Sequence, residues 1–101
     1  MTPRLIIIRP DGECISEPIG EPPTTDYLRR LVDGWIKAVP MFHSFHDQPC
    51  IAYRNEDGEK MRLEPNMTAT KAWMIAFEGA SEILLGTVVV IVGSREFLET
   101  V

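Results

Sequence analysis

The stretch from Cys50 to Trp73, CIAYRNEDGEKMRLEPNMTATKAW, decides much of the fold. The run Asn55-Glu56-Asp57-Gly58 is typical of a hairpin turn, and Pro65-Asn66 is typical of a helix start. A three-residue loop, Glu56-Asp57-Gly58, is the loop length that best keeps apolar residues on one face. We therefore predict a hairpin from Cys50 to Leu63, followed by a helix.

The register of this second hairpin separates apolar from charged side chains. The apolar face pairs Tyr53 with Met61 and Ile51 with Leu63. The opposite face carries a strip of three cations, which are Arg54, Lys60 and Arg62. Arg54 directly opposite Lys60 is mildly unfavourable unless a carboxylate or an anionic partner lies between them. The strip is either a solvated face neutralised by neighbouring glutamates or a surface that binds an acidic protein or a phosphate.

A first hairpin is predicted near the start of the chain. Leu5 to Ile8 reads as a strand, and Pro10-Asp11-Gly12 returns the chain through Cys14 to Ile19. This loop places Arg9 across from Glu13 and Ile8 opposite Cys14. Because apolar residues occur on both faces, we expect the pair to be partly covered on both sides and Cys14 to lie in the core.

The first helix is predicted after Thr24 or Thr25, either of which suits an N-cap position. Gly34 stands where a left-handed residue commonly ends a helix. The apolar stripe of this helix consists of Tyr27, Leu28, Leu31 and Val32. We expect a short helix packed on the surface of the sheet.

The second helix is predicted after Asn66 or Thr68 as cap, with Gly79 as its stop. Its apolar stripe follows helical spacing and consists of Ala69, Ala72, Trp73, Ala76 and Phe77. The alanines allow a close approach to a sheet. Since Trp73 falls within the stripe, we expect it to anchor packing.

Two further segments read as strands and complete the fold. Trp35 to Met41 is strand-like up to Pro40, and Thr87 to Val92 is an uninterrupted β-branched run typical of a central strand. We leave Arg95 to Val101 open as a helical turn or an edge extension. The order ββαβββαβ predicts one α+β domain over residues 1–101, with a curved, mixed but mostly antiparallel sheet and two helices. A small barrel-like closure is the alternative.

Composition and charge narrow the classes of partner. A net charge of -5 opposes attraction to a phosphate backbone, so we expect no nucleic-acid partner. The apolar run before Arg9, Leu5 to Ile8, has only four residues, too few for the apolar region of a signal peptide or for a membrane span. The two cysteines, Cys14 and Cys50, do not suggest a disulfide framework. We therefore expect a cytoplasmic protein with reduced thiols and no membrane association.

Five different short motifs follow one another in a specific order across nearly the whole chain. They are Ile7-Ile8-Arg9-Pro10-Asp11-Gly12, Leu31-Val32-Asp33-Gly34-Trp35-Ile36 before Val39-Pro40, Asn55-Glu56-Asp57-Gly58, Pro65-Asn66-Met67-Thr68-Ala69-Thr70 and Leu85-Gly86-Thr87-Val88-Val89-Val90. With these motifs the chain resembles domain of unknown function family 3846, small uncharacterised proteins of bacteriophages and some bacteria. The resemblance implies a phage or mobile-element setting and one compact domain, and it carries no activity or catalytic residues. The segment from Phe42 to Pro49 looks longer than the family's usual linker.

That segment and Cys50 contain the candidate metal ligands. His43 and His46 are separated by two residues, and with Cys50 they supply nitrogen and sulfur donors suited to zinc, with Asp47 as an oxygen donor. The alternative is a plain loop in which two phenylalanines pack against the core and the imidazoles stay in solvent. No cofactor is predicted.

Two functions of different classes remain. The first is a non-enzymatic phage-type accessory module that binds a host or phage protein, or a second copy through a sheet edge. Its candidate contacts are the basic hairpin face, a sheet edge and the aromatic residues Trp35, Phe42 and Phe45. The second is a small enzyme or metal-dependent binder centred on His43, His46 and Cys50. Since the chain lacks recognisable catalytic motifs, we favour the first.

Overall fold

The computed structural model describes residues 2–101 and shows an open six-stranded sheet with three helices. The strands lie in the order β2-β1-β6-β5-β3, and β4 pairs with β5 outside this path. Every strand pairing among these residues is antiparallel, and the sheet is not closed into a barrel. The predicted α+β fold is confirmed. The elements are β1 Arg4–Ile8, β2 Cys14–Pro18, α1 Thr25–Val32, β3 Ile36–Ala38, β4 Ser44–Phe45, β5 Gln48–Asn55, α2 Met67–Ala76, β6 Val88–Val92 and α3 Arg95–Leu98.

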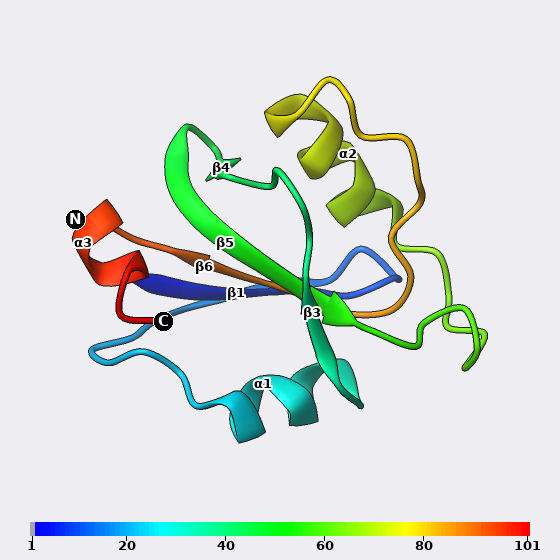
Figure 1. The fold of residues 1–101 in the computed structure, drawn as a ribbon, viewed down its shortest axis with the longest axis horizontal. Helices are drawn as coiled ribbons and strands as arrows, with labels where there is room; N and C mark the ends of the chain where they lie inside the picture. Colours follow the sequence, from blue (N-terminus) through cyan, green and yellow to red (C-terminus); the bar gives the residue numbers. More distant parts are fainter. Residues whose placement is uncertain (1) are drawn as a thin grey trace.

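The sheet forms the middle layer, with α2 on one face and α1 on the other (Figure 1). Alternate residues of β6 face opposite ways: Val88, Val90 and Val92 join the cluster under α2, while Val89 and Ile91 join the cluster over α1. All five are at most 1% exposed. Burying each such side chain stabilises the fold by about 1.5–3 kcal/mol. The prediction of a central strand at this position is confirmed.

The first hairpin forms in the predicted register, with Ile7 opposite Ile15 and Ile8 opposite Cys14. Arg9 pairs with Glu13 at 2.9 Å, although solvent around both side chains keeps this ion pair weak. The expectation that Cys14 lies in the core is wrong. All five residues of β2 are exposed, because β2 is the outermost strand and the core clusters of both faces stop at β1.

The predicted second hairpin is wrong. One edge of β5 pairs with β6 and the other pairs with β3 and β4, so no edge is free for a strand at residues 59–63. Instead residues 56–62 form consecutive turns. The element order begins as predicted, but its strands differ: β4, which was expected to be loop, takes the place of the missing strand, and α3 is added at the end.

Helix α1 begins as predicted, since the Thr24 side chain accepts a hydrogen bond from the Tyr27 amide. The left-handed residue that ends it is Asp33, with φ of 63°, and not Gly34. Glycine is required at position 34 for another reason, which is that a side chain there would collide with Asn55. A Cβ on Gly34 would lie 2.6 Å from Nδ2 of Asn55, which donates to the Val32 carbonyl at the end of the helix.

Helix α2 begins at the predicted cap, Asn66, whose side chain also ties the helix to the sheet. Its Oδ1 accepts from the Ala69 amide, and its Nδ2 donates to the carbonyls of Ile8 and Gly86. Asn66 is completely buried, and all these polar groups are paired. The helix ends at Ala76 with Phe77 in an extended conformation, so Gly79 is not its stop.

Strands β3 and β4 lie along the same edge of β5 and are separated by a break. Met41 adopts φ of 60°, and Phe42 turns inward until it is 1% exposed. Two side chains bond to carbonyls of this break: Trp73 Nε1 donates to Pro40 at 2.9 Å, and the Cys50 thiol to Phe42 at 3.5 Å. The break therefore anchors α2 to the sheet and limits the straight part of this edge to β3.

Candidate functional site

The junction between α1 and β3 holds a large exposed aromatic residue. Asn55 bonds to the carbonyls of Val32 and Asp33 at 2.9 and 3.2 Å, which fixes the end of the helix. Trp35 follows directly, and its carbonyl accepts from the Glu56 amide at 2.8 Å. Its backbone is thus held firmly while its side chain is 58% exposed. An exposed tryptophan on a rigid backbone is typical of a binding surface.

The Arg29 guanidinium stacks on Trp35, with its central carbon 3.7 Å from the ring centroid. Asp26 lies 3.9 Å from Arg29 on the same face of α1, a distant and solvated pairing. The Nε of Arg29 is buried and has no hydrogen-bond partner among residues 2–101. Cation–π contact at a partly exposed site contributes about 0.5–1 kcal/mol. The stack therefore orients both side chains, while the ion pair with Asp26 is solvated and weak.

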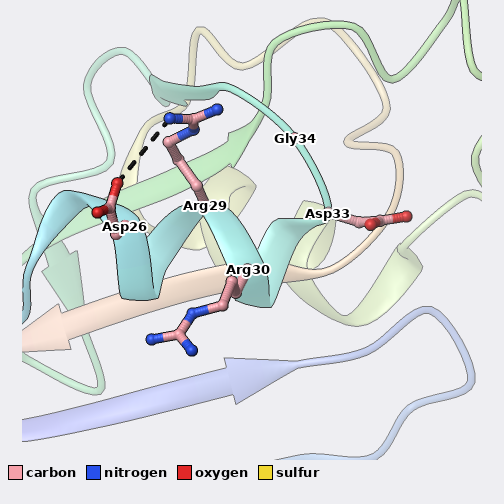
Figure 2. Close-up of a pocket in the computed structure, with 5 residues that line it drawn as sticks. All are labelled: Asp26, Arg29, Arg30, Asp33 and Gly34. Atoms are coloured by element: carbon pink, nitrogen blue, oxygen red, sulfur yellow. Dashed lines mark ion pairs between the residues drawn. The ribbon is translucent and has the colours of Figure 1, made fainter.

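An open cavity of about 570 Å³ lies beside this stack. It is lined by Asp26, Arg29, Arg30, Asp33 and Gly34. Figure 2 shows that Arg29 and Arg30 leave α1 on different sides and that Asp33 points away from both. General acid–base or nucleophilic catalysis needs groups that converge on one reacting atom. The charged groups that line the cavity do not converge in this way. The cavity adjoins the exposed surface formed by Trp35 and Arg29.

The outer edge of β3 lies next to Trp35. Hydrogen bonds from the Glu56 amide to Trp35 and from the Val39 amide to Ala52 mark positions 35, 37 and 39 as those whose backbone faces β5. In an antiparallel ladder the residues between them face away from the partner strand. The N–H and C=O groups of Ile36 and Ala38 are therefore directed outward, and the exposed Lys37 stands between them.

The predicted cationic strip does not form. Arg54 lies on β5 with its side chain 16% exposed and 3.6 Å from Glu82. It shares a cavity of about 300 Å³ with Lys60, but four carboxylates line that cavity as well: Glu56, Asp57, Glu59 and Glu82. Arg62 lies outside this cavity, exposed in the turn segment at φ of 54°. Since carboxylates outnumber the two cations, the surroundings oppose binding of a phosphate or an acidic protein.

The three predicted aromatic contacts are also separated. Phe42 is buried in the core under α2, so it cannot reach a partner. Phe45 packs on the same cluster and meets His46 edge-to-face at a centroid distance of 4.3 Å. Of the three, only Trp35 is largely exposed to solvent.

The predicted metal ligands do not converge. His43 and Cys50 line one cavity of about 580 Å³, whereas His46 lines another of about 270 Å³. Burial raises the pKa of the Cys50 thiol to about 12, so the thiolate that a metal needs is strongly disfavoured. Within residues 2–101 there is no group of three or more His, Cys, Asp or Glu side chains that could hold a metal ion.

Two residues of the surface around Trp35 were not predicted. Arg29 is six positions before Trp35 in the sequence, and only the bend at Asp33 folds the two together. Lys37 becomes an edge residue because β3 is outermost, which depends on the strand order. Trp35 itself was predicted as a candidate contact, and it is the one residue of this surface that the sequence indicated.

Comparisons with known proteins do not indicate a function, so the proposal below is argued from the structure. No protein-family model, curated protein or solved structure matches the chain. The resemblance to family 3846 therefore stays a prediction. None of the helices in residues 2–101 has the length and apolar character required to cross a membrane.

Proposed function

We propose that this chain is a non-enzymatic protein-interaction module that binds an acidic, extended segment along the outer edge of β3. The observation that carries the proposal is Trp35, which is 58% exposed at the start of an unpaired sheet edge with Arg29 stacked on it. The family resemblance adds an expected setting, the cytoplasm of a bacterial cell that carries a phage or mobile element.

The edge supplies the backbone part of such binding. An extended segment that adds to a sheet gains main-chain hydrogen bonds, while side chains on alternate positions decide which segment binds. Ile36 and Ala38 direct their backbone groups outward, so the added segment would bond to both residues. Pro40 and the turn at Met41 end the straight edge, which limits the contact to a short segment.

The side chains around the edge supply affinity and charge selection. Tryptophan and arginine are the residues most enriched among the contacts that dominate protein interfaces. Arg29 and Lys37 are both cationic, and the ion pair of Arg29 with Asp26, at 3.9 Å, is solvated and weak. An acidic segment is therefore favoured over a basic one at this edge.

Binding is tested with two synthetic peptides of equal length, one alternating Val and Glu and the other alternating Val and Lys. We expect the Val-Glu peptide to change tryptophan fluorescence and to slow hydrogen exchange of the Ile36 and Ala38 amides, with no effect from the Val-Lys peptide. Trp35→Ala should weaken binding by about tenfold or more. Ile75→Ala, at an 88% exposed site on α2, is the matched control and should bind normally. Equal responses to both peptides, or unprotected amides, would contradict the proposal.

A further inference from the structure

The side-chain amide of Asn55 holds the bend between α1 and β3 in place. Its Nδ2 donates to the carbonyls of Val32 and Asp33 at 2.9 and 3.2 Å. Its Oδ1 accepts from the Asp57 amide at 2.7 Å, and this bond determines that Nδ2 faces the bend. Asn55 is 1% exposed, so these bonds are shielded from water.

The sulfur of Met61 is a third acceptor for the same amide nitrogen. Sδ of Met61 lies 3.5 Å from Nδ2 of Asn55, in addition to the two carbonyl oxygens. An asparagine amide has only two hydrogens, so the three acceptors share them. A thioether sulfur is a weak acceptor, and the two carbonyls therefore keep the hydrogens while the sulfur is unmodified.

Met61 is accessible to reagents in solvent. It lies in the turn segment that follows β5 and is 44% exposed. A peroxide converts an accessible methionine to the sulfoxide. The O–O bond breaks, one oxygen atom bonds to the sulfur through a sulfur lone pair, and the other oxygen leaves as water. The sulfur loses two electrons and the peroxide gains them. The product places a polar oxygen beside the Asn55 amide.

We infer that Met61 is a modification site at which oxidation by a peroxide weakens binding to the β3 edge. This inference rests on the proposed function, because the affected surface is the same, and it adds regulation of that surface. The sulfoxide oxygen is a stronger acceptor than the thioether and draws one amide hydrogen of Asn55 away from the bend. Asp33 loses its bond first, since its carbonyl makes the longer of the two contacts.

Loss of that bond loosens the link between α1 and Trp35. Asp33 is the left-handed residue that ends α1, and it turns the chain so that Trp35 lies against the Arg29 guanidinium. A carbonyl left without a donor in a partly buried position is unfavourable, so the bend shifts until the carbonyl finds another partner. Trp35 and Arg29 are then no longer held together at the start of the edge.

The contact with Asn55 distinguishes Met61 from other exposed methionines. Met41, Met67 and Met74 are 49%, 44% and 45% exposed, so a peroxide reaches them as readily as Met61. Within residues 2–101, Met61 is the one methionine whose sulfur accepts a hydrogen bond from a side chain. Reductases specific for each sulfoxide epimer return methionine, so the effect on binding is reversible.

Dilute hydrogen peroxide applied to the whole chain tests the inference, with mass spectrometry to measure sulfoxide at each methionine. We expect oxidation of Met61 to lower the affinity for the Val-Glu peptide by about twofold to tenfold, the range for loss of one hydrogen bond. Hydrogen exchange of the Gly34 amide, which donates to the Arg29 carbonyl at 3.0 Å, should become faster. Treatment with methionine sulfoxide reductases should restore both values.

Three variants identify the methionine responsible. Met61→Leu keeps a similar apolar volume without sulfur, so it should bind as untreated wild type does, before and after peroxide. Met67→Leu, at an equally exposed position, is the matched control and should lose affinity on oxidation as wild type does. Met61→Gln places an uncharged oxygen acceptor near Asn55 and should weaken binding without peroxide. Circular dichroism verifies that each variant is folded.

The outcomes separate this inference from the proposed function. If wild type bound the Val-Glu peptide equally well before and after complete oxidation of Met61, the inference would be overturned and the proposed function would stand. Equal losses of affinity in wild type and Met61→Leu would also overturn the inference, because Cys14 and both tryptophans are unchanged in that variant. If untreated wild type did not bind the peptide, the proposed function and the inference would both be overturned.

Discussion

Replacing Asn66 with alanine should destabilise the fold by about 3 kcal/mol. Its Nδ2 donates to the carbonyls of Ile8 and Gly86, both at 2.9 Å, and its Oδ1 accepts from the Ala69 amide at 3.0 Å. Asn66 is 0% exposed, so water cannot replace these bonds without opening the structure. Losing the helix cap costs about 1 kcal/mol, and each carbonyl left without this donor costs roughly 1 kcal/mol or more.

Asn66→Ser separates the two parts of this cost. A serine hydroxyl can accept from the Ala69 amide at the cap but is too short to reach the two carbonyls, so we expect a loss of about 2 kcal/mol. Thr68→Ala, an exposed site within the same helix, is the matched control and should change stability by less than about 0.5 kcal/mol. Total stability of small domains is typically about 5–15 kcal/mol, so these differences are large.

Urea unfolding followed by far-ultraviolet circular dichroism measures each free energy of unfolding. A lower midpoint with an unchanged slope would show that stability alone has changed. If Asn66→Ala cost less than about 1 kcal/mol, the side chain would not be bridging helix and sheet as the distances indicate. If the serine variant were as stable as wild type, the two carbonyl bonds would carry no net energy.

Three further predictions concern the thiols and a turn. Under native conditions Cys14 should react quickly with a thiol reagent, whereas Cys50, which is 3% exposed, should react only on unfolding; two fast thiols per native chain would contradict this. Burial raises the pKa of Cys50 from 9.0 to about 12, so the unfolded chain releases this proton first and the free energy of unfolding should fall as the pH rises through that range. Cys50→Ser retains a hydrogen-bond donor and does not titrate there, so it should flatten the fall in urea melts. The slope that is left comes from Tyr27 and Tyr53, because burial raises the pKa of both. His46 and Asp47 adopt φ of 50° and 63° in the β4–β5 turn, so His46→Asn with Asp47→Gly should add about 1 kcal/mol and raise the melting temperature; a lower value would count against strain there.

The parts of the fold that depend on neighbouring residues could be predicted from the sequence. The first hairpin is fixed by a short turn, and the caps at Thr24 and Asn66 by side chains three residues from their partners. The continuous apolar run from Val88 to Val92 identified a strand covered on both faces. Each of these signals is local and is read without knowledge of the strand order.

The prediction of the second hairpin was wrong. Its turn motif is a local signal, whereas the strands that pair with β5 in its place are not indicated by neighbouring residues. Asn55 ends a genuine strand, yet β3 and β6 already pair with the two edges of β5. The prediction that Cys14 lies in the core was wrong for a related reason. Cys14 lies on β2, and no local sequence pattern reveals that β2 is the outermost strand. Of the predicted binding residues, Trp35 lies on the surface now proposed, while Arg29 and Lys37 gained their roles only from the bend after α1 and the position of β3.

The pairing of β1 with β6 also constrains how the protein is made. Ile8 pairs with Val88 and Arg4 with Val92, so the first strand to leave the ribosome cannot complete its inner edge until the last one has emerged. During that interval the apolar side chains of β1 lack the contacts that β6 supplies in the folded protein. Pairings between residues this distant in sequence are slow to form and leave the growing chain open to aggregation. Translation speed and chaperone supply should therefore affect the yield of this protein more than the strength of its local turns.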